Sequence, residues 1–273
     1  MRGLWLLCVP LAVGACDTVW RLDHVGEPKG DAPTDGRDRG DCAGGAHDED
    51  GDQLPDACDL CPGIADDQAD VDNDGVGDAC DPSPNTQDTI ALFISFADPA
   101  QLWHGVDGTW STSDGENLTY ASPEFNMTGS TLFQGVMPDP PFTLEYHYRV
   151  DTIDVLPSIF GVLVDADSTA SGVACGQTRT TNPLEDVVRN TYTAKTLASE
   201  TPIMTVTPGG YRVTATYDRT GRIQCTLASD DGTTGGGTTL TWTSDKAPAA
   251  GALGFRSFQV GASVQYVTIY KHK

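Results

Sequence analysis

Short segments in which apolar and polar positions alternate dominate the chain from about residue 89 onward. In residues 142–150 the alternation places one set of side chains on a single face of a strand, namely Phe142, Leu144, Tyr146, Tyr148 and Val150. Further candidate strands cover residues 90–96, 159–164, 211–217, 222–227, 238–243, 253–257 and 264–270. We find no convincing amphipathic helix. The pattern predicts a mainly β protein, with a two-sheet jelly-roll β-sandwich over residues 89–273.

The first 15 residues have a different pattern, a positive start followed by an apolar stretch too short for a permanent membrane span. They are typical of an export signal. Their ending, Val13-Gly14-Ala15-Cys16, resembles the bacterial lipoprotein box, which implies that Cys16 is lipidated and that lipid alone anchors the protein. An ordinary cleaved signal, with Cys16 merely nearby, is the alternative. We expect a location in the cell envelope, at the outer membrane or the cell surface rather than the inner membrane.

Residues 16–41 are rich in Gly, Pro and charged residues without apolar periodicity, and they predict a flexible tether. Charge becomes informative in the next segment. The chain has 39 acidic and 16 basic residues, for a formal net charge of −23. Between Asp41 and Asp88 there are 15 acidic residues and no Lys or Arg. This charge would repel a polyanion, so nucleic acid is excluded as an expected partner.

The acidic residues recur in register when the chain is shifted by 22 positions. Each copy has carboxylates at positions 1, 3, 5, 9 and 12 of a loop, the oxygen spacing with which an EF-hand loop binds calcium, and a main-chain carbonyl at position 7. The flanking Cys, Pro and Gly residues argue against the helices of an EF-hand. The predicted calcium ligands are Asp48, Asp50, Asp52, Leu54, Asp56 and Asp59 in the first copy, and Asp70, Asp72, Asp74, Val76, Asp78 and Asp81 in the second.

The two copies differ at the sharp turn, where the second has Gly75 and the first has Gln53. Because a side chain is tolerated poorly in such a turn, we expect the first site to be weaker. Glu49, Asp66 and Asp67 are candidates to help hold additional ions. A solvated acidic linker is the alternative interpretation, but irregular acid would not repeat at fixed spacing with Cys in register.

Residues 56–81 carry a specific resemblance. The string Asp-Ala-Cys58-Asp-Leu-Cys61-Pro, then Asp67-Gln68, then the acidic loop ending at Asp81, resembles the thrombospondin type 3 repeat. In that family the repeats wrap around a row of calcium ions with little hydrophobic core, and disulfides link successive units. The resemblance therefore implies a calcium-binding segment over residues 42–88, with disulfides Cys42–Cys58 and Cys61–Cys80.

The sandwich segment bears a more diffuse resemblance, to concanavalin A-like or laminin-G-like domains. It is carried by aromatic-Gly phrases such as residues 103–115, 160–164 and 254–257, and by the closing 266–270. Such folds bind sugars or proteins, and some are glycoside hydrolases. Cys175 and Cys225 could form one bridge between strands or loops. Four aromatic residues could stack on sugar rings, although core positions are the more common role: Trp103, Trp110, Tyr120 and Trp242.

Motifs for catalysis are missing from the sequence. It has no Glu-x-Asp-x-x-Glu strand, no Gly-x-Ser-x-Gly elbow and no His-Glu-x-x-His. His104 and His147 stand isolated and are expected on the surface. We therefore predict a non-enzyme, a calcium-binding envelope protein that acts in adhesion or in recognition of a glycan or an extracellular protein. The alternatives are a structural spacer without a specific ligand and an envelope polysaccharide hydrolase or lyase.

Overall fold

The structure, a computed structural model, describes most of the chain after residue 46. The described ranges are 47–97, 103–112, 115–121, 128–135, 137–153, 158–166, 173–179, 184–190, 195–200, 208–220, 222–231, 238–243 and 252–273. The predicted signal, the tether, Cys16 and Cys42 lie outside these ranges. None of the helices within them has the length and apolar character needed to cross a membrane.

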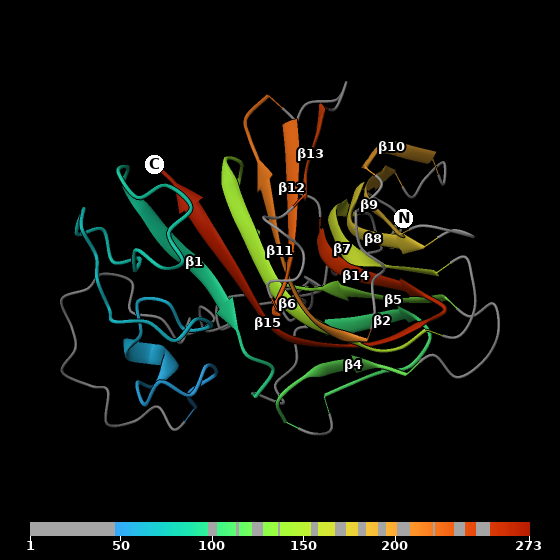
Figure 1. Cartoon of the computed structure of the whole chain (residues 1–273), viewed down its shortest axis with the longest axis horizontal. Helices are drawn as coiled ribbons and strands as arrows, with labels where there is room; N and C mark the ends of the chain where they lie inside the picture. Colours follow the sequence, from blue (N-terminus) through green and yellow to red (C-terminus); the bar gives the residue numbers. More distant parts are fainter. Residues whose placement is uncertain are drawn as a thin grey trace, which may run out of the picture.

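Two antiparallel sheets make up the domain that follows residue 87 (Figure 1). The first sheet has the order β13 (Thr238–Thr243), β12 (Arg222–Ser229), β11 (Gly209–Tyr217), β6 (Phe142–Ile153), β15 (Val260–His272), β4 (Leu118–Tyr120) and β3 (Trp110–Ser111), and β1 (Asp88–Ile94) also pairs with β15. The second has the order β10 (Lys195–Glu200), β9 (Leu184–Asn190), β8 (Val173–Arg179), β7 (Ser158–Ala166), β14 (Ala252–Phe258), β5 (Thr128–Phe133) and β2 (Trp103–Asp107).

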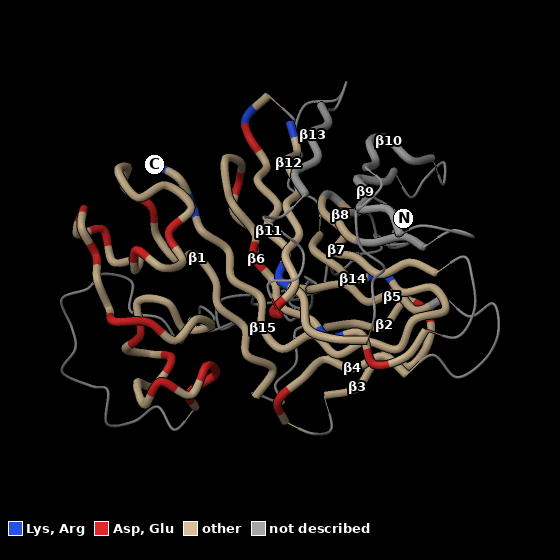
Figure 2. Tube along the Cα trace, in the orientation of Figure 1, with Lys and Arg blue, Asp and Glu red and all other residues tan. Residues whose placement is uncertain are grey.

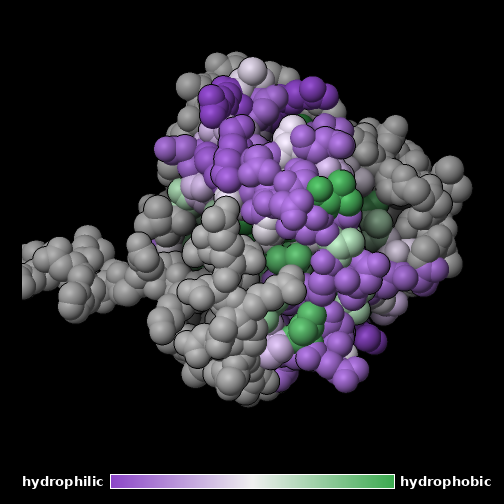
Figure 3. All heavy atoms as spheres, turned by 90° about the vertical axis from the view of Figure 1, so that its left-hand side faces the viewer, coloured by the Kyte–Doolittle hydropathy of each residue, from purple (hydrophilic) through white to green (hydrophobic). Residues whose placement is uncertain are grey.

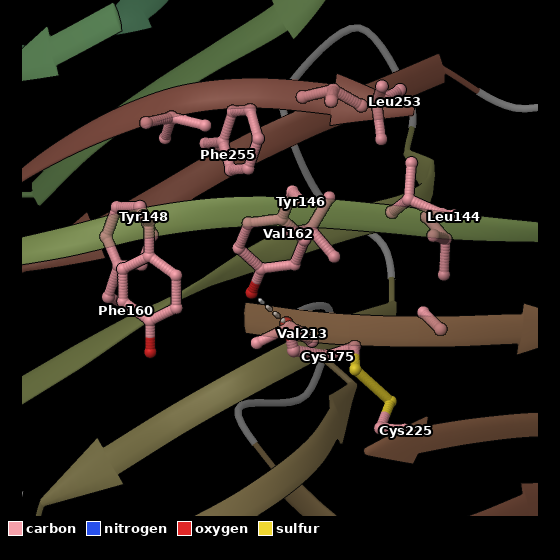
Figure 4. Close-up of a cluster of buried hydrophobic side chains, with 14 of the residues drawn as sticks. Leu144, Tyr146, Tyr148, Phe160, Val162, Cys175, Val213, Cys225, Leu253 and Phe255 are labelled. Carbon is pink, nitrogen blue, oxygen red and sulfur yellow. Dashed lines mark hydrogen bonds between the residues drawn. A yellow bond between two sulfur atoms is a disulfide. The ribbon is translucent and has the colours of Figure 1, made fainter. Parts of the chain in front are cut away.

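The core lies between the sheets and is built largely from aromatic rings (Figure 4). Tyr148 of β6 stacks on Phe160 of β7 with ring centroids 4.7 Å apart, and Tyr146 meets Phe255 of β14 edge to face at 5.4 Å. Offset and edge-to-face arrangements of this kind add to the hydrophobic gain of burial. The predicted inward face of residues 142–150 is confirmed, because all five of its apolar side chains are buried.

One disulfide crosses from sheet to sheet. Cys175 of β8 is bonded to Cys225 of β12, with an S–S distance of 2.17 Å (Figure 4). Next to it, the hydroxyl of Tyr146 donates a hydrogen bond to the main-chain oxygen of Cys175 at 3.2 Å. The predicted bridge is therefore confirmed, and it links the two layers of the sandwich.

The predicted strands are present, and several others were not expected from the sequence, among them β2, β5 and β8. Gly209 and Gly210 begin β11 and pair with Val150 and Arg149. Gly210 has a packing role there. A Cβ atom at this position would lie 1.8 Å from Oδ2 of Asp230, so the glycine leaves room for that carboxylate.

Residues 47–87 form an irregular segment, which we call the acidic segment, with a single short 3-10 helix, η2 (Asp56–Cys58). It lies beside the edge of the first sheet formed by β1 and β15 (Figure 1). Its small apolar cluster joins Cys61, Val76 and Cys80 to Tyr270 of β15. The mainly β architecture with an irregular segment ahead of a sandwich is thus confirmed.

Candidate metal centre

Main-chain amides of the first acidic loop donate hydrogen bonds to the loop's own carboxylates. The main-chain amides of Gly51 and Gln53 donate to the two carboxylate oxygens of Asp48, at 2.8 and 3.0 Å. The amide of Asp52 donates to Asp50 Oδ1 at 3.0 Å. These turns bring carboxylate oxygens of Asp48, Asp50 and Asp52 within 4.8 Å of one another. Three anionic oxygens therefore converge on one point, as a metal ion would need.

The second loop repeats the arrangement. The amide of Gly75 donates to Asp70 Oδ2 at 3.1 Å, and that of Val76 donates to Asp74 Oδ1 at 2.8 Å. Asp70, Asp72 and Asp74 again place carboxylate oxygens within 4.8 Å of one another. Loop positions 1, 3 and 5 of both copies are thus brought together, at the spacing from which a cation site was predicted.

The acids predicted at positions 9 and 12 lie in other surroundings. Asp56 is buried, and its carboxylate accepts hydrogen bonds from the amide of Glu49 at 2.8 Å and from Nδ1 of His47 at 2.7 Å. Asp78 accepts from the amide of Val71 at 2.9 Å, and Asp81 accepts from the amide of Ser83 at 2.7 Å. These contacts show Asp56 and Asp78 bracing their loops.

Asp59 belongs to a third group of carboxylates. Its oxygen lies within 4.8 Å of those of Asp52 and Asp66, so this group joins the first copy to the linker before the second. The side-chain amide of Gln68 donates to both Asp59 Oδ1 and Asp66 Oδ1, at 2.6 and 2.7 Å. Asp52 is shared between the first and third groups.

The carboxylates of the acidic segment are not balanced by basic side chains of the same segment. Figure 2 marks many Asp and Glu positions in red along the segment, and residues 47–97 contain no Lys or Arg. The face on which the segment lies is mostly hydrophilic (Figure 3). Four buried carboxylate oxygens of the segment, and one of Asp88 at the start of β1, have no hydrogen-bond partner: Glu49 Oε2, Asp50 Oδ2, Asp66 Oδ2, Asp72 Oδ2 and Asp88 Oδ2. An anionic oxygen buried without a partner is strongly unfavourable. Cations within the segment would remove this cost.

The pKa values show the same imbalance. Burial, reinforced by neighbouring carboxylates, raises the pKa of Glu49 to about 8 and that of Asp50 to about 7. Burial is also the main cause that raises the pKa of Asp59. Desolvation and like-charged neighbours both disfavour the ionised form of an acid. These carboxyl groups therefore lack the counter-charge that a bound cation supplies.

Backbone geometry distinguishes the two copies at the sharp turn. Gly75 has φ +96°, and Gln53, at the equivalent position, has φ +81°, in the left-handed region that favours glycine. We expect Gln53→Gly to tighten calcium binding by the first copy and to raise the free energy of unfolding by about 0.5–1 kcal/mol. Calcium titration and thermal unfolding measure both effects. Gln53→Ala is the control, because it keeps the side-chain penalty; equal behaviour of the two variants would contradict this account.

Disulfides brace the segment as well. Cys61 and Cys80 are bonded, with an S–S distance of 2.19 Å and a Cα–Cα distance of 5.6 Å, as predicted. Cys58 is also disulfide-bonded, and its predicted partner Cys42 lies outside the described residues. Because their thiols are oxidised, Cys58, Cys61 and Cys80 do not offer thiolates to a metal, which leaves oxygen as the donor.

The acidic segment packs on the outer face of the first sheet. A Cβ atom at Gly63 would lie 2.5 Å from Cζ of Tyr266, so the backbone of the segment rests directly on that ring. At the other end, His47 Nε2 is 3.2 Å from the carboxylate of Glu116, which lies in the chain between β3 and β4. Burial disfavours protonation of His47, but its hydrogen bonds to Asp56 and Glu116 outweigh it and raise the pKa.

Beneath the segment lies a polar cluster that the sequence did not reveal. The hydroxyl of Tyr266 donates to Glu145 Oε1 at 3.0 Å, and Arg212 forms an ion pair with the same oxygen at 3.7 Å. Burial raises the pKa of Glu145, against the opposing effect of Arg212 and Tyr266. The prediction that His147 is isolated is wrong, because its Nε2 is 2.8 Å from both carboxylate oxygens of Asp230. His104, by contrast, is exposed, as expected.

The candidate sugar-stacking residues take core positions where their side chains are described. Trp103 packs against Phe96, Phe133 and Phe255, with ring centroids 5.3–5.7 Å apart. Trp110 packs on Tyr120, which is fully buried, at 5.0 Å. The side chain of Trp242 lies outside the described part. The rings of Trp103, Trp110 and Tyr120 therefore pack in or against the core and stabilise the sandwich.

Comparison with known proteins places the fold. No protein-family model and no curated protein matches the sequence. Among solved structures, the exoplasmic/lumenal domain of VIP36 in its Ca2+/Man3GlcNAc-bound form matches with a TM-score of 0.51 and 13% identity, covering 66% of this chain and 87% of that one. The likeness is one of fold. It confirms the predicted lectin-like β-sandwich.

Weaker matches include two further sugar-binding proteins. The lectin UEA-II complexed with galactose matches with a TM-score of 0.47 and 14% identity, over 67% of this chain and 100% of that one. The carbohydrate-binding module CBM66 from Bacillus subtilis matches with a TM-score of 0.46 and 17% identity, over 62% and 95%.

Proposed function

We propose that this chain is a calcium-binding protein of the cell envelope, in which the acidic segment holds calcium beside a β-sandwich that recognises a carbohydrate or a protein. One observation carries the proposal. Four buried carboxylate oxygens without hydrogen-bond partners lie in the acidic segment, which has no Lys or Arg, and a fifth belongs to Asp88 at the start of β1. A bound cation would reconcile their burial with their charge.

Calcium suits this donor set better than other common metals. The three carboxylate groups offer hard oxygen ligands, and calcium accepts six to eight of these in flexible geometry. Zinc prefers sulfur and nitrogen, and magnesium requires a stricter octahedron with more water. The in-register acids at positions 1, 3 and 5, with the resemblance to the thrombospondin type 3 repeat, support the same ion. The matched VIP36 domain is itself a calcium-bound structure.

Recognition is assigned to the sandwich because its fold is shared with the VIP36 exoplasmic/lumenal domain, which was solved in a Man3GlcNAc-bound form. A non-enzymatic role is the better hypothesis. The most deeply buried glutamate of the first sheet, Glu145, is engaged by Arg212 and Tyr266 beneath the acidic segment and is not open to a substrate. The lipoprotein-like ending at Cys16 supports export and attachment to the membrane by lipid, at the outer membrane or the cell surface.

Calcium titration of the mature chain, followed by binding to glycan and matrix-protein arrays with calcium and with chelator, tests the proposal. We expect a calorimetric and circular-dichroism response at or below millimolar calcium, in the range of extracellular modules, and array binding that weakens on chelation. No response to millimolar calcium contradicts the metal assignment. Silence on both arrays favours a structural spacer, and product formation from a polysaccharide panel favours a hydrolase or lyase.

A further inference from the structure

Asp88 stands apart from the two acidic loops in sequence and yet faces their charge. It is the first residue of β1, and its side chain is 0% exposed. In the β1–β15 pairing it lies opposite His272, whose Nδ1 is 2.9 Å from Asp88 Oδ1. The second oxygen, Oδ2, is buried and has no hydrogen-bond partner. A strand of the sandwich thus begins with a half-satisfied buried carboxylate.

The surroundings of Asp88 are acidic. Its main-chain amide donates a hydrogen bond to Asp74 Oδ2, so strand and loop are in direct contact. Its carboxylate also repels those of Asp72 and Asp81.

These contacts leave buried negative charge without a counter-charge where the acidic segment meets the sandwich. The described residues offer Asp88 one basic partner, His272, and that partner takes Oδ1. Asp72 Oδ2 is a second buried oxygen without a partner, in the same loop as Asp74, which the amide of Asp88 contacts. Hydrogen bonds within the loop leave both oxygens unsatisfied. A divalent cation between them would satisfy both, because calcium readily takes ligands from several carboxylates.

We propose that Asp88 is a ligand of the calcium ion held by the Asp70–Asp81 loop, so that the sandwich itself contributes to this site. The proposal rests on the proposed calcium-binding function and adds a residue outside the repeat. It also gives calcium a second effect. An ion shared by the loop and β1 fastens the acidic segment to the sheet, beside the apolar contacts of Tyr266 and Tyr270.

The test uses Asp88→Asn in the full mature chain. Asparagine has nearly the same shape and keeps an oxygen acceptor for His272, but it removes the charge. In chelator, the variant should unfold at the same or a higher temperature than the wild type, because an uncompensated buried charge is gone. In saturating calcium it should unfold at a lower temperature, and its second-loop calcium affinity should fall at least about tenfold. Asp107→Asn, at an exposed position of β2, is the matched control and should change neither.

The change of sign separates ligation from a purely structural role. If Asp88 serves only to pair with His272, the variant loses the same stability with and without calcium, and the proposal is overturned. A failure of the proposed function looks different, since the wild type would then show no calcium response at all.

A measurement on the wild type decides the matter if the variant does not fold. Amide hydrogen exchange is followed during a calcium titration. Ligation by Asp88 predicts slower exchange in β1 and at the His272 end of β15, with the same calcium midpoint as residues 70–81. Protection that stops at residue 81 overturns the proposal.

Discussion

Replacing Asp52 with asparagine is expected to weaken calcium binding at two positions at once, by at least about tenfold at each. Asp52 is the carboxylate shared by the group with Asp48 and Asp50 and by the group with Asp59 and Asp66. The substitution removes charge from both while keeping the oxygen that accepts from the amide of Leu54 at 2.8 Å. Isothermal titration with calcium measures the affinities and the number of ions bound.

Two other substitutions serve as comparisons for Asp52→Asn. Asp48→Asn touches one group only, and should weaken one ion. Asp67, a candidate additional ligand from the sequence, is exposed and lies outside the three groups of described residues, so Asp67→Asn controls for the loss of overall charge. If Asp52→Asn and Asp67→Asn bind calcium equally well, charge in general and not a shared ligand attracts the ion. If Asp52→Asn resembles Asp48→Asn, the third group holds no ion.

Replacing Cys175 and Cys225 together with alanine is expected to lower the free energy of unfolding by about 4 kcal/mol. The bridge joins residues 50 apart in sequence, and closing a loop of that length restricts the unfolded chain by about this amount in the chain-entropy model. Both sulfur atoms also sit in the core between the sheets, so their removal costs packing as well. Chemical denaturation followed by tryptophan fluorescence measures the change.

The wild type under reducing conditions is the matched control for this double variant. Reduction opens the other disulfides as well, so the alanine variant is measured under the same reducing conditions. The wild type then keeps both side chains at positions 175 and 225, and any further loss of stability in the variant reports packing alone. Equal denaturation midpoints for the oxidised wild type and the double variant would show that the bridge does not stabilise the fold.

Much of the first sheet is predictable from sequence because its strands face two different environments. Residues 142–150 and 211–217 alternate cleanly, and they become β6 and β11. The second sheet is harder. β5 contains Ser130 and Thr131, whose small polar side chains are buried although they carry no apolar signal. Pairing with β14 and β2 determines this strand, and such long-range contacts leave no local pattern.

The candidate metal centre likewise has parts that the sequence predicts and parts that it does not. The grouping of positions 1, 3 and 5 follows from local turns, which the spacing of the acids encodes. The third group does not, because it depends on how Asp59 folds back toward Asp66 through Gln68. The sequence also did not reveal which part of the outer face of the first sheet the acidic segment covers. Thr143 and Glu145 occupy the polar face of β6 and yet are buried, because the outer side of a sheet becomes interior only where another segment covers it.

The placement of β15 constrains the order in which this molecule can be assembled. It follows every other strand in sequence, yet it pairs with β6 on one side and with β4 and β1 on the other. The acidic segment, synthesised first, rests on Tyr266 and Tyr270 of this strand. The surface on which the acidic segment packs therefore forms only after β15 has been synthesised. Non-local pairing of this kind makes folding slow. The calcium loops can pack against the sheet only after the strands of the sandwich have paired.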